Sequence, residues 1–420
     1  MSDSDLQVAA TTLPARRETG HRLRRPLLLA GFGLVLFSLV RILAGANDLT
    51  STGSLGAAVG LAVPIGMAGL GGLWAERSGV VNIGLEGMMI LGTWGAGWAG
   101  YQWGPWAGVA MGVACGTLGG LVHALLTVTF GVDHIISGVA INILGLGATQ
   151  YLADVTFVTA PGGSSTQSPS VGNLPVLSVP GMSSALSGLV DRHWFLVSDA
   201  AGAVLAVTVD VSVLTVIAIG LVVLTYVVLW RTSFGLRLRF CGENPTAAAS
   251  LGVNVYRFKY AAVAMSGALS GFGGAFLALV AANAYREGQT GGRGFIGLAA
   301  MIFGNWRPGG LALAAGLFGY TDALQLRRGG ESVHALLLLM ALLLVGYAVF
   351  EFTRRRTRVA VLSLATAAAF LVWFLGTDSV PDDFAGLTPY VTTLLVLALA
   401  SQRLRMPAAD GQVYRRGQSG

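Results

Sequence analysis

Long apolar runs recur along almost the whole of this 420-residue chain. Each run holds roughly 16–30 residues, and a helix of about 20 apolar residues crosses the ~30 Å hydrocarbon core of a bilayer. Only 11% of the residues are charged, whereas a soluble domain carries roughly 25%. Too few charges remain to coat a water-soluble surface. The chain is therefore predicted to be an all-α, polytopic integral membrane protein, with about 10–12 transmembrane helices.

Two of the runs allow more than one interpretation. The run 26–46 resembles a signal peptide, because Ala44-Gly45-Ala46 is like a cleavage site, but its length and the many runs after it favour an uncleaved first helix. The stretch 295–325 is interrupted by residues 305–310, so it forms either two spans (295–304 and 309–325) or a re-entrant hairpin. The other spans are expected near 54–74, 84–103, 106–130, 134–155, 200–230, 258–281, 332–351, 359–376 and 387–402.

The net charge of +6 comes from Arg residues grouped between the runs. These groups lack the interleaved aromatic residues of a nucleic-acid site, so they are taken as a topology signal. By the positive-inside rule, both termini and residues 231–257 lie in the cytoplasm, and 156–199 lies outside. The domain plan is a cytoplasmic tail at 1–25, a transmembrane core at 26–352, an extra C-terminal transmembrane hairpin at 353–402, and a disordered cytoplasmic tail at 403–420.

Polar residues near the ends of the runs are the first candidates for function. Glu76 and Arg77 form either a surface pair in a cytoplasmic turn or a deeper contact. Asn82, Glu86 and Asn142 begin or enter apolar runs, where polar groups need a partner or a water-filled path. These three are predicted to line a translocation path or to bond neighbouring helices.

Residues 244–251 carry the signals of a short helix between two spans. Asn244 suits the N-cap, Pro245 the first helical position and Gly252 the C-terminal stop. An isolated helix of about two turns is unstable in water, so something else must hold it. Ala247 and Ala248 are small enough to let a partner surface approach closely.

Glycine marks close contacts and breaks. Gly112, Gly116 and Gly120, and later Gly267 and Gly271, have the spacing that lets membrane helices pack closely. The Gly-rich segment 291–308 is typical of tight turns or of a broken helix, and transporters often build solute sites at broken helices.

Catalytic and metal motifs were not found. A P-loop needs Gly-Lys-Ser/Thr, and the single lysine, Lys259, lies between Phe258 and Tyr260. Any ATP and Mg²⁺ must therefore be bound by another polypeptide. His134 has no ligand-spaced partner, and two cysteines make neither a metal cluster nor a disulfide framework.

Together these segments resemble the permeases of binding-protein-dependent ABC importers, within the branched-chain amino acid and simple sugar permease superfamily. The resemblance extends over about 54–350 and rests on four motifs. It is strongest for the branch that serves nucleosides and simple sugars with a basic-membrane-protein-type receptor. The motifs are residues 76–88, residues 135–138 with Asn142, residues 242–255, and residues 294–308.

The resemblance implies a type II-like ABC importer permease in the bacterial inner (plasma) membrane. It implies two cytoplasmic ATP-binding subunits, a second permease subunit in a hetero- or homodimer, and an extracytoplasmic substrate-binding lipoprotein. A small solute and membrane lipid complete the expected partners, without nucleic acid, cofactor or metal in this chain. Residues 244–251 would be the coupling helix seated on the ATPase. The expected coupling residues are Gly242, Glu243, Asn244, Pro245, Ala247, Ala248, Leu251 and Gly252.

Two other classes of protein stay open at this point. A secondary transporter driven by an ion gradient would need a membrane-embedded carboxylate, for which Glu86 and Asp210 are the candidates. A lipid-modifying membrane enzyme would gather Asp, His or Arg on one membrane face, and no such cluster is visible in the sequence. The chain is therefore predicted to be a transport subunit and not an enzyme.

Overall fold

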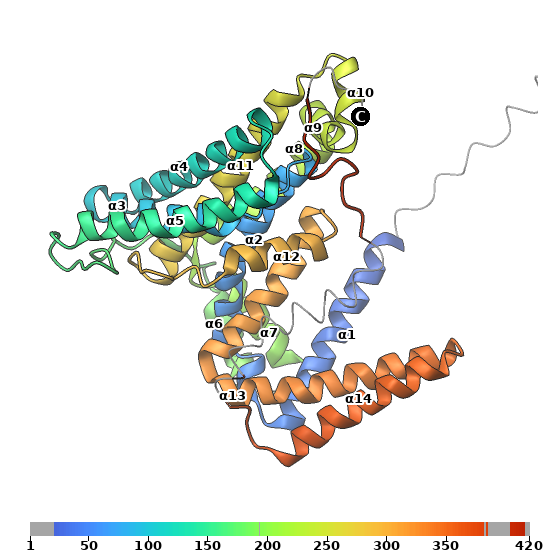
Figure 1. The fold of residues 1–420 in the computed structure, drawn as a ribbon. Coiled ribbons are helices and arrows are strands. Elements are labelled where there is room, and N and C mark those ends of the chain that lie inside the picture. Colours follow the sequence, from blue (N-terminus) through green and yellow to red (C-terminus); the bar gives the residue numbers. More distant parts are fainter. Residues whose placement is uncertain (1–20, 193, 382–383, 385–403, 416–420) are drawn as a thin grey trace, which may run out of the picture.

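The computed structural model describes residues 21–192, 194–381, 384 and 404–415, and almost all of its regular structure is helical. Two short strands, β1 and β2, pair antiparallel through Val176 with Ser212 and Leu177 with Val211. The prediction of an all-α polytopic membrane protein is confirmed (Figure 1). The elements are α1 (His21–Ala44), η2 (Asn47–Leu49), α2 (Thr52–Arg77), α3 (Leu85–Trp103), α4 (Pro105–Ala124), η3 (Leu125–Thr129), α5 (His134–Phe157), β1 (Val176–Leu177), α6 (Met182–Val190), α7 (Val197–Thr208), β2 (Val211–Ser212), α8 (Val213–Arg231), α9 (Ser233–Glu243), α10 (Pro245–Ser250), α11 (Val255–Phe276), η4 (Leu277–Ala281), α12 (Arg293–Phe303), α13 (Pro308–Thr353) and α14 (Thr357–Gly376).

Seven helices in the described part of the chain are long and apolar enough to cross a bilayer. Three further apolar helices are shorter, at Gly33–Ala44, Val197–Thr208 and Arg293–Phe303. The last expected span, 387–402, lies outside the described residues. The seven are Thr52–Arg77, Pro105–Thr129, His134–Phe157, Val213–Arg231, Val255–Ala281, Val333–Thr353 and Thr357–Gly376.

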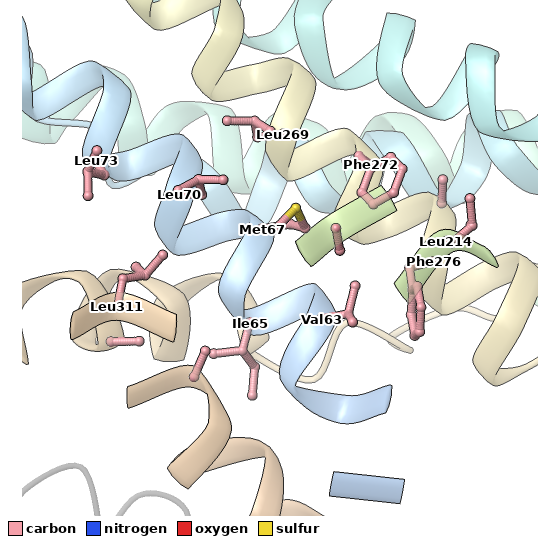
Figure 2. Close-up of a cluster of buried hydrophobic side chains, with 14 of the residues drawn as sticks. Val63, Ile65, Met67, Leu70, Leu73, Leu214, Leu269, Phe272, Phe276 and Leu311 are labelled. Atoms are coloured by element: carbon pink, nitrogen blue, oxygen red, sulfur yellow. The ribbon is translucent and has the colours of Figure 1, made fainter. Parts of the chain in front are cut away.

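The core of the bundle lies around α2 and α11, the two most buried of these seven helices. Figure 2 shows Leu70 and Leu73 of α2 in one hydrophobic cluster with Leu269 of α11. In the same cluster, Val63 of α2 lies close to Phe276 of α11. The residues of α2 from Val63 to Glu76 are thus buried inside the protein. Packing between apolar side chains of α2 and α11 therefore holds these two helices together at the centre of the bundle.

Glycines bring α4 and α11 into backbone contact. A Cβ added to Gly116 would meet the carbonyl oxygen of Gly267 and lie 2.5 Å from the Gly271 Cα. A Cβ on Gly120 would lie 2.5 Å from the Val263 oxygen. No side chain fits there, which confirms that these small-residue repeats serve close helix packing.

The expected span 200–230 is wrong, because the chain breaks in the middle of it. Helix α7 ends at Thr208, and α8 begins at Val213. Asp210 between them has a φ of 53° and accepts a hydrogen bond from the Ser178 hydroxyl at 2.9 Å. The β1–β2 pairing closes this turn, so α7 is a short separate helix.

The expected spans 309–325 and 332–351 are joined in one helix, α13, of 46 residues. At 1.5 Å per residue such a helix would be about 69 Å long if straight, more than twice the thickness of a bilayer core. Figure 1 shows α13 changing direction along its length, with α14 packed along its second part. The two expected spans are therefore parts of one bent helix.

The prediction of a disordered tail at 403–420 is wrong for residues 404–415. This segment packs beside α9 and α10, where Figure 1 places the C-terminus. Pro407 and Ala409 are buried, and the Ala409 N–H donates to the Gly242 carbonyl at 2.9 Å. Small and apolar residues between the charges let the segment fold against the helix ends.

Candidate functional site

The predicted short helix is present as α10, with the capping expected from the sequence. The Asn244 side chain accepts from the Ala247 N–H at 2.9 Å, and Pro245 occupies the first turn. Gly252 has a φ of 80°, the left-handed conformation that suits glycine after a helix. The local geometry therefore follows from the sequence, while the ATPase-coupling role stays a prediction.

The exposed face of α10 differs from the prediction that Ala247 and Ala248 would let a partner surface approach closely. Ala248 is buried and packs in a cluster with Cys241 and Val255 of the same chain, so it cannot approach a partner. Leu251 is 74% exposed, and Thr246 and Ser250 are also exposed. A partner would therefore meet α10 through these three residues.

The end of α9 ties α10 to α2. Gly242 is so close to the α2–α3 turn that an added Cβ would lie 2.5 Å from the Arg77 carbonyl oxygen. Glu243 is exposed, and one of its carboxylate oxygens lies 3.9 Å from an Arg77 guanidinium nitrogen. Motion of α9 and α10 would thus reach the C-terminal end of α2.

Glu76 and Arg77 do not form a surface pair with one another, and that interpretation is wrong. The Trp306 indole N–H donates to the Glu76 carboxylate at 2.6 Å. The Arg77 guanidinium donates to the Trp306 carbonyl at 2.8 and 3.1 Å. Both side chains are therefore held to the α12–α13 turn, and Trp306 is buried there with a φ of 52°.

The three candidate path residues are all hydrogen-bonded within the chain. Asn82 is fully buried, and its amide donates to the Ser266 hydroxyl on α11 at 2.8 Å. The Asn142 oxygen accepts from the Gly87 N–H at 2.7 Å, and its amide donates to the Ile83 carbonyl at 3.1 Å. These contacts are the helix-bonding role that the sequence left open beside path lining.

Glu86 occupies the N-terminus of the broken helix α12. Its carboxylate accepts from the backbone N–H groups of Gly292 at 3.0 Å and Gly294 at 2.6 Å. These amides have no partner within their own helix, and the positive end of the helix dipole favours a negative charge there. Beside it, the guanidinium of Arg293 pairs with Asp322 of α13 at 2.6 Å. The broken helix expected within 291–308 is therefore present, and Arg293 at its start is paired with Asp322.

Sequence reasoning missed a second buried ion pair, between Arg41 of α1 and Asp199 of α7, at 2.9 Å. The Thr50 hydroxyl also donates to Asp199. Arg41 interrupts an apolar run, and a charge in such a run needs a partner. The position of Arg41 could have predicted that it has an acidic partner. It could not have identified that partner, because Asp199 is 158 positions away along the chain.

An apolar groove of about 380 Å³ lies among α2, α7, α8 and α13. Its lining is mostly small or apolar, with Thr215 and Tyr320 as its polar members. Asn82, Glu86 and Asn142 are not part of this lining. Among the described residues, no group of three His, Cys, Asp or Glu side chains could hold a metal ion.

Comparison with known proteins places the chain among transport proteins. The family described as branched-chain amino acid transport system / permease component matches residues 54–348. The chain is 35% identical to the guanosine ABC transporter permease protein NupQ of Bacillus subtilis (strain 168), over 63% of this chain and 79% of that protein. It is 31% identical to the nucleoside ABC transporter permease protein NupC of Lactococcus lactis subsp. cremoris (strain MG1363), over 84% and 93%.

A third relative matches most of the length of both chains. The chain is 32% identical to the putative glucose ABC transporter permease protein TsgC13 of Haloferax volcanii (strain ATCC 29605), over 87% of this chain and 98% of that protein. No solved structure matches the chain.

Proposed function

Since the chain belongs to the family of branched-chain amino acid transport system permease components, we propose that it is the membrane-spanning permease subunit of an ATP-driven importer. The solute would be a nucleoside or a simple sugar, in keeping with the names of its relatives. The observation that carries the proposal is the family match over residues 54–348, which includes all the helices from α2 to α12. The chain is accordingly a multi-pass protein of the plasma membrane.

The coupling step is assigned to α10. This six-residue helix is capped, packs against α9 and α11, and exposes Leu251 to the cytoplasm. An exposed leucine on so short a helix suits docking into a groove of an ATPase subunit, which would carry the ATP and Mg²⁺. Closure of the ATPases would press on α10, and the α9 contacts at Gly242 and Glu243 would pass the motion to α2.

The remaining partners follow from the same class of importer. A second permease subunit, related or identical, would complete the translocation path, and an extracytoplasmic binding lipoprotein would deliver the solute. The exposed Ser- and Gly-rich segment 158–175 lies at the opposite end of the bundle from α10 and would face that receptor.

The described structure gives the alternative of an ion-driven transporter little support. Such a carrier needs a membrane carboxylate that exchanges its partner for an ion. Glu86 is bound to two backbone N–H groups, and Asp322 is paired with Arg293. Asp210 lies in the exposed turn between α7 and α8 and is bonded to Ser178.

The proposal is tested by reconstituting this chain with its second permease, ATPase subunits and receptor in proteoliposomes. Uptake of radiolabelled guanosine, ribose and glucose is measured with ATP supplied to the ATPase side. ATP-dependent accumulation of a nucleoside or a sugar is expected, with unlabelled solute of the same class competing. Accumulation of neither class, in a complex that hydrolyses ATP, would contradict the proposed solute.

A further inference from the structure

Residues 404–415, which we call the strap, bind the cytoplasmic turns of several distant elements. The Arg405 N–H donates to the Asn305 side chain in the α12–α13 turn at 2.8 Å. The Ala408 N–H donates to the Glu243 carboxylate at 3.2 Å, and the Ala409 N–H donates to the Gly242 carbonyl at 2.9 Å. The strap thus links the α12–α13 turn to the end of α9.

The second half of the strap lies behind α10. Tyr414 packs on Tyr256 at the start of α11, with ring centroids 5.6 Å apart. It also joins the cluster of Cys241, Ala248 and Val255 that supports the buried side of α10. An outward movement of α10 would therefore disturb the strap.

At its centre the strap places one carboxyl group against another. Asp410 lies beside Glu76 of α2. Both Asp410 oxygens are buried, and their hydrogen-bonding neighbours are the Glu76 carboxyl group and the Gly411 backbone. Two charged carboxylates so close repel one another, and the contact favours a shared proton.

The other charged groups near Asp410 are cationic. Arg77 comes from α2 and Lys259 from α11, and both favour the charged form of Asp410. Glu243 from α9 holds Arg77 from its other side. Burial outweighs these cations and raises the pKa of Asp410 to about 7.

We propose that the strap is an inhibitory latch that holds α9, α10 and the ends of α2 and α12 together, and that its grip weakens as the pH rises. The latch role rests on the proposed function, because the separation it prevents is the cytoplasmic opening of a transporter. The strap is suited to release. It is held by few hydrogen bonds and buries one carboxyl group against another, and such segments open at low free-energy cost.

The direction of the pH effect follows from linkage. A carboxyl group whose pKa is higher when docked than when free binds its proton more tightly in the docked state. Docking is then strongest in acid and is lost progressively as the pH rises toward 7. For a shift from 3.8 to about 7, the docking equilibrium falls about 30-fold between pH 5.5 and 8.

The first test fixes the strap in place. Tyr414→Cys in the strap and Tyr256→Cys at the start of α11, whose rings pack together, are combined in a chain carrying Cys115→Ser and Cys241→Ala, within the complete complex. A short reducible bis-methanethiosulfonate linker joins them, and each single cysteine is the control. Linking should lower ATP-driven uptake at least tenfold, and reduction should restore it. Unchanged uptake in the linked complex would overturn the latch, as would failure of the two cysteines to link. Absence of uptake even in the reduced complex would count against the proposed function instead.

The second test reads the strap without transport. A nitroxide is attached at Val413→Cys in the same cysteine background, and its mobility is measured between pH 5.5 and 8. The ratio of immobile to mobile label should fall about 30-fold with rising pH and should stay constant in Asp410→Asn. A label at Leu251→Cys, away from the carboxyl pair, serves as the control. Mobility that is independent of pH in the chain with Asp410 intact would overturn the pH-sensitive grip.

Discussion

At the scale of single residues, the polar side chains inside this protein act mainly as connectors between broken segments of backbone. Glu86 binds the free amides at the start of α12, and Asn142 binds both a donor and an acceptor in the 83–87 segment. The sequence identified both residues as unusual, because a polar group in an apolar run needs a reason. It could not identify their partners, which lie on elements far apart along the chain.

The role of Glu86 predicts a graded loss of stability. Glu86→Ala leaves the buried Gly294 N–H and the partly buried Gly292 N–H without an acceptor, at a cost of about 1–3 kcal/mol for a buried group. Glu86→Gln keeps one acceptor oxygen, so its stability should lie between that of the wild type and that of Glu86→Ala. The measurement is thermal unfolding of the purified protein in detergent. Equal melting temperatures for all three proteins would show that the carboxylate does not hold α12.

At the scale of elements, the α4–α11 contact depends on residues that have no side chain. Gly116→Leu would force apart two helices whose backbones touch, so we expect a large loss of folded protein. Gly147→Leu on α5 is the matched control, since an added Cβ there meets nothing within 4 Å. Folded yield is measured by size-exclusion chromatography in detergent. A Gly116→Leu protein that folds as well as the Gly147→Leu control would rule out this packing.

Substitutions on the exposed and buried sides of α10 should have different effects: one should weaken ATPase binding, and the other should weaken folding of the permease. Leu251→Asp changes an exposed residue and should lower co-purification of the ATPase subunits while leaving the permease stable. Ala248→Asp places a charge in the buried cluster and should destabilise the permease itself. Arg358→Glu, in the exposed first turn of α14, is the control for added negative charge. Full ATPase retention by Leu251→Asp would exclude this face of α10 from the interface.

At the scale of the whole molecule, the sequence predicted the class and the main helices better than the connections. Apolar length alone located α2, α5 and α14 to within a few residues. It failed at 200–230, where a turn lies inside an apolar run, and at 326–331, where the helix α13 continues from one run into the next. Composition suggested a disordered tail because it cannot show that Pro407, Ala409 and Tyr414 meet complementary surfaces. These outcomes depend on contacts between distant residues, which run length does not describe.

The orientation of the whole chain in the membrane gives a further prediction. In a background of Cys115→Ser and Cys241→Ala, Ser165→Cys should react with an impermeant thiol reagent in intact cells. Leu251→Cys should react only after permeabilisation. Both positions are exposed in the structure, so a lack of reaction would reflect the side of the membrane. Reaction of Leu251→Cys in intact cells would reverse the topology.

The central claim is that this chain moves its solute with energy from ATP hydrolysed by a partner subunit. The most direct measurement is solute uptake by the complete reconstituted complex, compared with a complex whose ATPase subunits bind ATP but cannot hydrolyse it. Both are assayed with and without an imposed proton or sodium gradient. The account predicts uptake only with active ATPase, whatever the ion gradient. Gradient-driven uptake by the complex with inactive ATPase would contradict it.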